Sequence, residues 1–261
     1  MSIPKYGSRG LHYPLGKVYM LGDVHNEADK LTDVLAQIEP LLTPEDHIVF
    51  CGDLFDRGPR AASTAEILIT FAKKYPTQVF FVRGNHDYML QNYLLTGSHN
   101  WMSYLIVTLE DFKLQWNLPD IMPDTITKAL ADRGFREITF RMIPYYETDE
   151  ILVTHAPLDI VTVQIFGGDH YEKDYNDNLA VNDFNFKHLL ERIGDDLMWQ
   201  FSDEDRVIPT IKKFRVCGHQ PGRFKHPRIF RDRAFIDTGC GKGPRPLTCM
   251  VYPGKKYWQS K

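Results

Sequence analysis

The sequence predicts an α/β fold whose core is a β-α-β-α-β unit. Three short apolar runs each end in polar residues, and stretches with helical periodicity lie between them. Asp23 precedes Asp53 by 30 residues, and Asp53 precedes Asn85 by 32, which matches the ~30 residues of one βαβ unit. We therefore expect three parallel strands whose polar ends meet at one edge, the place where α/β sheets bind ligands.

The three apolar runs predict strands buried on both faces, because they are continuously apolar rather than alternating. They cover residues 18–21, 48–51 and 79–82. Apolar residues at helical spacing predict helices over 27–38 and 61–75. The stretch 90–140 is expected to be mostly helical, with Asp124 as an N-cap and Gly134 ending a helix.

Later apolar runs predict a second set of strands. They cover residues 151–155, 214–219, 235–239 and 248–252. The segment 158–205 is polar, acid-rich and weakly periodic, and we expect it to be a helical insertion near the functional site. The chain, 1–261, is expected to form a single domain, since α/β folds of this length are commonly one unit.

The composition is that of a water-soluble globular protein. Of its 261 residues 43% are hydrophobic and 25% charged, and no run reaches the ~18 apolar residues of a membrane helix, so no membrane association is expected. The opening residues lack the ~7–15-residue apolar core of a secretory signal, and the four cysteines show neither a disulfide framework nor zinc-like spacing. A cytoplasmic location is therefore expected.

Charge is unevenly distributed along the chain. Residues 206–261 contain fourteen Lys or Arg and two acids, whereas the whole chain has a formal charge of −3. This asymmetry suggests an anionic ligand, and a solvated basic edge is the alternative explanation.

Polar side chains of a particular kind gather at the predicted strand ends. They are Asp23, His25, Asp53, Asp56, Arg57, Asn85, His86, His155 and His219. Carboxylate, amide and imidazole ligands without thiolates suit Mn²⁺, Fe²⁺ or Zn²⁺. Two such ions bridged by one carboxylate, roughly 3.5–4 Å apart, would polarise a phosphoryl group and lower the pKa of a bridging water. Asp53 is the candidate bridge, because its strand lies between the other two.

The polar residues stand in five short motifs: Gly22-Asp23-Val24-His25, Gly52-Asp53-Leu54-Phe55-Asp56-Arg57-Gly58, Arg83-Gly84-Asn85-His86-Asp87, Thr154-His155-Ala156 and Cys217-Gly218-His219. These motifs resemble those of the metal-dependent phosphoprotein phosphatases of the calcineurin-like metallophosphoesterase superfamily. The superfamily includes bacterial and phage serine/threonine phosphatases and symmetrical diadenosine tetraphosphate hydrolases. The resemblance implies a two-sheet β-sandwich flanked by helices.

The resemblance also implies a role for each motif residue. The first metal would be held by Asp23, His25 and Asp53, and the second by Asp53, Asn85, His155 and His219. His86 would be the general acid, Asp56 would orient it, and Arg57 would bind phosphate. A second phosphate-binding arginine is expected after a Trp-bearing segment similar to 197–199; Arg206 is the candidate and Arg192 its rival.

The chain departs from the family pattern at three places. Asn26 stands where the family usually has Gly, and because both tolerate a left-handed backbone the turn is expected to survive. Asp87 stands where eukaryotic members carry Glu. Residues 236–240, Ile-Asp-Thr-Gly-Cys, resemble the bacterial branch of the family, but the segment that follows, 241–245, Gly-Lys-Gly-Pro-Arg, is not the usual continuation of that branch.

Each assignment has a structural alternative. The aspartates could cap helices, the histidines could be satisfied polar residues at strand ends, and Arg57 could be a surface cation. Asp237 is either a partner of His219 or part of a turn, and Arg83 is expected to pair structurally with an acid. Cys51 and Cys217 are expected to be buried small hydrophobic residues. The histidines outside the motifs, which are His12, His47, His99, His170, His188 and His226, are expected in loops or at the surface.

The predicted activity is two-metal hydrolysis of phosphate monoesters by direct attack of a hydroxide that bridges the metals, with Mn²⁺ the expected ion and Fe²⁺ or Zn²⁺ as alternatives. A serine/threonine protein phosphatase is the first prediction. Symmetrical diadenosine tetraphosphate hydrolysis, which yields ADP, is the second, and a non-catalytic metal-bound interaction module is a remote third. The partner is thus a phosphorylated protein or a nucleotide polyphosphate, and no nucleic acid is expected.

Overall fold

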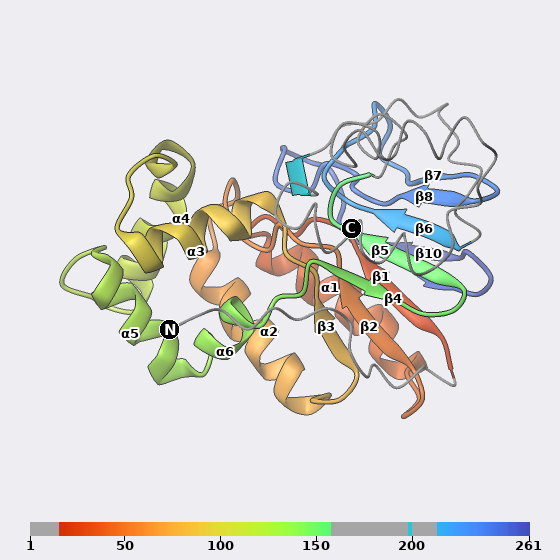
Figure 1. The fold of residues 1–261 in the computed structure, drawn as a ribbon, viewed down its shortest axis with the longest axis horizontal. Coiled ribbons are helices and arrows are strands. Elements are labelled where there is room, and N and C mark those ends of the chain that lie inside the picture. The colour runs from red at the N-terminus through yellow and green to blue at the C-terminus, as the bar shows by residue number, and fades with distance from the viewer. Residues whose placement is uncertain (1–15, 158–197, 200–212) are drawn as a thin grey trace, which may run out of the picture.

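The computed structural model describes residues 16–157, 198–199 and 213–261. In these residues two five-stranded sheets pack face to face, and helices flank them, as Figure 1 shows. The two-sheet α/β architecture implied by the family resemblance is confirmed. The segments of the chain that carry Arg192, Arg206 and nearly all of the predicted insertion 158–205 lie outside the described residues.

The first sheet contains the predicted parallel core. Its strand order is β10-β9-β1-β2-β3, where β1 (Val18–Leu21), β2 (His47–Phe50) and β3 (Val79–Phe81) run parallel. β9 (Thr248–Tyr252) pairs antiparallel with β1, and β10 (Tyr257–Gln259) pairs antiparallel with β9. The run 248–252 was expected in the second set of strands, and this expectation was wrong, because β9 joins the first sheet.

The second sheet has the order β4-β5-β6-β8-β7. Its parallel strands are β5 (Ile151–Thr154), β6 (Phe214–Cys217) and β8 (Arg233–Phe235). Two short antiparallel strands, β4 (Tyr145–Glu147) and β7 (Arg228–Ile229), lie at its edges. The predicted run 235–239 is wrong in extent, since the strand ends at Phe235 and the chain turns there.

The helices of the structure are α1 (Ala28–Ile38), the 3₁₀ helix Glu39–Leu41, α2 (Ala61–Lys74), α3 (Asn85–Thr96), α4 (Met102–Gln115), α5 (Pro123–Arg133) and α6 (Arg136–Phe140). Gly134 ends α5 with a φ of +81°, as predicted. Asp124 is not the N-cap: α5 begins at Pro123 after Met122, since proline suits the first helical position. α3 begins at Asn85, so Asn85 and His86 lie on the first turn of a helix.

The core explains why the strands of the first sheet are apolar on both faces. Val18 and Met20 of β1 pack between the two sheets, whereas Tyr19 and Leu21 pack against the helices. This alternation follows from the two-residue period of a strand. β3 is the exception, because it is an edge strand whose residues are only half-buried. Within the described residues, no helix is long and apolar enough to cross a membrane.

Candidate metal and phosphate site

The site lies where the loops after β1, β2, β5 and β6 meet the start of α3. The backbone N–H groups of Val24 and His25 both donate to the carbonyl of Asp53, at 3.0 Å. In the second sheet, the N–H of Gly218 donates to the carbonyl of His155 at 2.8 Å. These bonds tie neighbouring loops to each other and fix the places from which the side chains project.

The backbone at the site is unusual. Eight non-glycine residues of the described chain have positive φ; five of them belong to the predicted motifs and a sixth, Asn26, directly follows one. The five are His25, Asp53, Asp56, Arg57 and His219. A left-handed conformation costs a non-glycine residue roughly 1–2 kcal/mol, and such strain concentrates at functional sites. Asn26, with φ of +58°, adopts the turn that was predicted for it.

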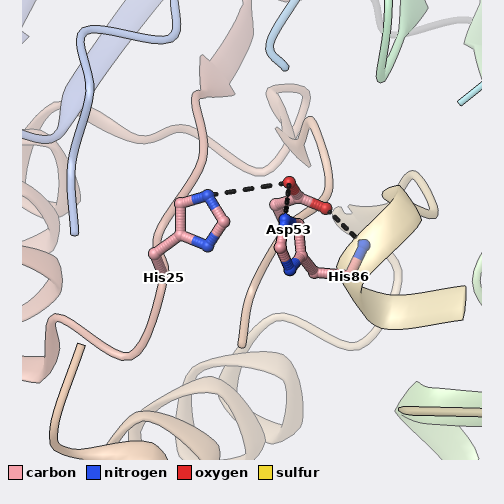
Figure 2. Close-up of side chains that lie close together, drawn as sticks. All are labelled: His25, Asp53 and His86. Atoms are coloured by element: carbon pink, nitrogen blue, oxygen red, sulfur yellow. Dashed lines mark hydrogen bonds and ion pairs between the residues drawn. The ribbon is translucent and has the colours of Figure 1, made fainter. Parts of the chain in front are cut away.

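Asp53 lies at the centre of the site. Figure 2 shows its carboxylate between His25 and His86, with His25 Nε2 3.6 Å and His86 Nε2 3.9 Å from Oδ2. On its other side, His155 Nε2 lies 3.4 Å from Oδ1. The structure thus gives two groups of ligand atoms that share Asp53, one with His25 and His86 and one with His155 and His219. This shared position is the one predicted for a bridging carboxylate.

The ligand atoms of Asn85, His155 and His219 have the spacing of metal ligands. Asn85 Oδ1 lies 3.0 Å from His155 Nε2 and 3.1 Å from His219 Nδ1, and the two imidazole nitrogens are 3.1 Å apart. Ligands that sit at about 2.0–2.2 Å from one ion are roughly 3.0–3.5 Å from each other. Oxygen and nitrogen donors without thiolate suit a borderline divalent ion. The residues present therefore fit a metal at this place.

Backbone carbonyls fix which ring nitrogen of two histidines points into the site. Nδ1–H of His25 donates to the carbonyl of Phe55 at 3.0 Å, and Nδ1–H of His155 donates to the carbonyl of Cys51 at 2.8 Å. Each bond leaves Nε2 as the inward lone pair. Metal-ligating histidines are oriented in this way.

Asp23 lies between the two groups. Its two carboxylate oxygens accept the backbone N–H of His219, each at 3.1 Å, and one of them is 3.9 Å from His25 Nε2. Asp23 is buried, and burial and then Asp237 raise its pKa well above the usual range. The opposing effect of His155 does not outweigh them, so the positive charge of the protein alone does not fully compensate this carboxylate.

The pKa values of three histidines at the site are also shifted. Burial lowers the pKa of His25 to about 3, and burial with His155 lowers that of His219 to about 3, so both rings are neutral. Burial also acts to lower the pKa of His155, but Asp53 and Asp23 outweigh it and raise the value to about 10. A buried site that retains a proton so strongly is one in which a bound cation would be favoured.

The predicted acid and phosphate-binding group stand beside Asp53. His86 Nδ1 lies 2.6 Å from Asp56 Oδ2, and the backbone N–H of His86 donates to Asp53 Oδ1 at 2.9 Å. The exposed Arg57 donates from Nη2 to His86 Nε2 at 3.1 Å. His86 and Asp56 are both buried, so the carboxylate holds the ring with Nε2 toward the site and toward Arg57.

Two supporting roles were not assigned in the sequence analysis, those of Asp87 and Thr108. The buried Asp87 carboxylate accepts the N–H groups of Asp53 at 2.8 Å, Leu54 at 3.0 Å and Gly84 at 3.0 Å, and so joins the loop after β2 to the start of α3. Thr108 Oγ1 of α4 accepts the N–H of Asp56 and the side-chain amide of Asn26, at 3.1 and 2.9 Å. The position of Asp87 directly after Asn85-His86 was the available signal, whereas nothing local marks Thr108.

The remaining assignments divide between confirmation and correction. Asp237 Oδ1 accepts the N–H of Gly239 at 2.7 Å, which agrees with the turn alternative. Arg83 donates to Gln91 at 3.3 Å and lies over the Tyr88 ring, as a structural residue would, and its predicted pairing with an acid stays a prediction. All four cysteines are free and buried, which confirms the prediction for Cys51 and Cys217. His47 was expected at the surface or in a loop and lies instead buried in β2.

His47 is buried because β2 is the central strand of the parallel core, and its Nδ1 lies 2.7 Å from the hydroxyl of Tyr146. His99 and His226 are exposed, as expected. Of the Trp-bearing segment only Met198–Trp199 is described, and the Trp199 ring stacks on Trp101 with centroids 5.4 Å apart.

Comparison with known proteins identifies the family. The model of the calcineurin-like phosphoesterases matches residues 16–197. A bis(5'-nucleosyl)-tetraphosphatase (asymmetrical), PrpE, of a Geobacillus species is 24% identical over 91% of both chains. A PP2A-like serine/threonine-protein phosphatase of Candida albicans is 33% identical over 27% of this chain and 16% of its own.

Solved structures share the fold. A protein serine/threonine phosphatase of Saccharomyces cerevisiae superposes with a TM-score of 0.54 at 14% identity, covering 95% of this chain and 80% of its own. A cold-active protein tyrosine phosphatase superposes with a TM-score of 0.55 at 15% identity, covering 93% and 78%. The chain belongs to the calcineurin-like phosphoesterase family and is a phosphoesterase enzyme.

Proposed function

We propose that the protein hydrolyses phosphoric ester or anhydride bonds with two divalent metal ions, by direct attack of water and without a covalent phosphoenzyme. One observation carries this proposal: the buried carboxylate of Asp53 has His25 beside one oxygen and His155 beside the other, and the His86–Asp56 pair stands next to it. This combination provides for metal ions and for protonation of a leaving group within one site.

The ligand sets that we propose are those implied by the family resemblance; the structure supports the shared position of Asp53 but places His86, and not Asp23, in the group with His25. One ion would be held by Asp23, His25 and Asp53, and the other by Asp53, Asn85, His155 and His219. When bound, the ions would polarise the phosphoryl group and acidify the attacking water. We propose Mn²⁺ as the ion, because oxygen and nitrogen donors without thiolate suit it, and Fe²⁺ or Zn²⁺ suit the same set.

The protein's own groups would handle the phosphate and the proton. Arg57 offers a planar fork of N–H donors to two phosphate oxygens. Its present bond to His86 Nε2 occupies that nitrogen. A phosphate that took the donors of Arg57 would leave Nε2 of His86 able to carry a proton to the departing oxygen, while Asp56 stabilises the charged ring.

The substrate that we propose is a dinucleoside polyphosphate. The relative that aligns along 91% of both chains is a bis(5'-nucleosyl)-tetraphosphatase, and the basic C-terminal fifth of the chain suits a polyanion. A phosphoprotein, the first prediction from the motifs, is the second candidate. It is supported by the 33% identity to a serine/threonine-protein phosphatase, which extends over only 27% of the chain.

The test is a comparison of kcat/KM on diadenosine tetraphosphate and on a phosphoserine peptide, with protein stripped by a chelator and reconstituted with Mn²⁺. A preference for the dinucleotide of about tenfold, or 1.4 kcal/mol of transition-state discrimination, is expected. ADP as the sole product would mean symmetrical cleavage, and AMP with ATP asymmetrical cleavage. A preference for the peptide would make the protein a phosphoprotein phosphatase, and no product above the chelated control would indicate a non-catalytic module.

A further inference from the structure

A glycine-rich loop, residues 239–245, lies against the site and has no role in the proposed chemistry so far. At Gly241, where φ is +80°, an added Cβ would lie 2.5 Å from Cβ of His25 and 3.3 Å from Cβ of Arg57. The backbone of the loop therefore touches both a proposed metal ligand and the proposed phosphate-binding arginine. Lys242 is the next residue, so it is placed at the rim of the site.

The loop is held by contacts that leave the Lys242 side chain out. Asp237 accepts the N–H of Gly239 at 2.7 Å, and the Lys242 backbone N–H donates to the carbonyl of Gly239 at 2.9 Å. Arg245 donates to the carbonyl of Gly222 at 2.8 Å, and Lys30 donates to that of Gly243 at 3.2 Å. The loop is thus anchored at both ends and in the middle.

The Lys242 side chain is exposed, and within the described part of the chain no carboxylate forms an ion pair with it. Its loop lies against Cβ of His25 and Cβ of Arg57 at the neighbouring Gly241. A solvent-facing ammonium on this loop, with no ion pair in the described part of the chain, is available to an anion.

We infer that Lys242 binds a phosphate of the substrate other than the one that is hydrolysed. The inference rests on the proposed function, and it gives a reason for a polyphosphate substrate. A phosphate monoester has only one phosphoryl group, and Arg57 would bind that group, so Lys242 would have no phosphate to bind. An ammonium on a flexible stem accepts phosphate oxygens over a range of positions. Lys242 would therefore select for a second phosphate in the chain of the substrate.

The experiment measures kcat and KM on diadenosine tetraphosphate and on p-nitrophenyl phosphate for the wild type, Lys242→Ala, Lys242→Arg and the control Lys225→Ala. Lys225 is an exposed lysine of the same basic region. For Lys242→Ala we expect KM for the dinucleotide to rise roughly tenfold relative to any change on p-nitrophenyl phosphate, as befits the loss of one charge-assisted contact. Lys242→Arg should restore most of the affinity, and Lys225→Ala should behave as the wild type.

Equal effects of Lys242→Ala on both substrates, no effect on either, or the same effect from Lys225→Ala would each overturn the inference. The inhibition constant of diadenosine tetraphosphate against p-nitrophenyl phosphate hydrolysis measures its binding even where it is not cleaved. Failure to cleave the dinucleotide would therefore count against the proposed substrate. An inhibition constant unchanged by Lys242→Ala would count against the role of Lys242.

Discussion

At the residue scale, the most informative side chain is His86, because each of its ring nitrogens has a different neighbour. Nδ1 lies 2.6 Å from the buried Asp56 carboxylate, and Nε2 faces Arg57 at 3.1 Å and Asp53 Oδ2 at 3.9 Å. The first contact fixes the orientation of the ring, and the second places the exchangeable nitrogen where a phosphate would lie. A purely structural histidine would not need a nitrogen directed at the arginine.

This geometry predicts how His86→Asn behaves. The variant should lose about 10²–10⁴-fold in kcat on substrates with a poorly stabilised leaving oxygen, such as an alkyl phosphate, because that oxygen needs a proton. It should lose far less on p-nitrophenyl phosphate, whose leaving group needs little protonation. Steady-state rates on both substrates, with bound metal measured in parallel, check the prediction. Equal losses on both substrates with unchanged metal content would show that His86 is not the acid.

At the scale of elements, β6 and β8 present a charged pairing that stabilises the second sheet. Arg215 and Arg233 lie on these neighbouring strands, and their guanidinium groups are mostly buried. Both donate to Asp232, from Arg215 Nη2 at 2.5 Å and from Arg233 Nη1 at 3.0 Å. Burial acts to raise the pKa of Asp232, but Arg215 and then Arg233 outweigh it, so that the pKa is lowered.

The lowered pKa fixes the sign of a pH effect. The ionised Asp232 stabilises the fold fully above its unfolded pKa of about 3.9, and that contribution is lost as pH falls through its lower folded value. Asp232→Asn should therefore reduce the free energy of unfolding by about 1 kcal/mol at pH 7, a figure discounted because a third of the Asp232 side chain is exposed. The deficit should shrink as the pH is lowered below about 4.

Urea unfolding of metal-free protein at a series of pH values measures this difference, with Asp149→Asn, an exposed position, as the control. The control should match the wild type at every pH. A deficit for Asp232→Asn that stays constant down to the lowest pH at which the protein folds would mean that packing, and not charge, is lost in the variant.

A helix or strand could be predicted where its own residues carry the pattern, and could not where contacts with distant parts of the chain decide it. The run 18–21 was correctly read as a strand, because both of its faces meet apolar neighbours and the whole run is apolar. β4 and β7 have only three and two residues, too few for any periodicity, and they were missed. β9 was recognised as a strand but assigned to the wrong set, because the choice of β1 as its partner is made by tertiary packing.

At the scale of the whole molecule, the sequence predicted which polar residues would come together at the candidate site, and the structure does bring them together, whereas their metal and catalytic roles stay predictions. The polar residues after β1, β2 and β6 belong to motifs whose order and spacing can be recognised in the sequence. The structure brings these residues together. What the sequence did not reveal are the contacts between distant elements that hold them. Thr108 on α4 reaches the site from a part of the chain that carries no motif, and the contacts of the 239–245 loop with His25 and Arg57 were not predicted from its sequence.

The site also joins the two sheets. Asp23 and Asp53 follow β1 and β2 of the first sheet, whereas His155 and His219 follow β5 and β6 of the second. Ions held by these residues would connect both layers of the fold, and a ligand that binds only the folded state stabilises it by mass action. We therefore expect metal removal to affect the stability of the entire molecule and not only its activity.

At a free Mn²⁺ concentration of about 100 times its Kd the stabilisation should be about 2.7 kcal/mol, or roughly 5–10 °C in Tm for a chain of this length. Differential scanning calorimetry with Mn²⁺ and with a chelator measures it. Asp53→Ala should bind less than one ion by elemental analysis and lose most of the shift relative to its own metal-free form, because Asp53 contributes to both ligand groups. Lys225→Ala should keep the full shift. An Asp53→Ala protein that retained two ions and the whole increase in Tm would exclude Asp53 as the shared ligand, and the connection between the sheets would then have to depend on His155 and His219 with Asn85 alone.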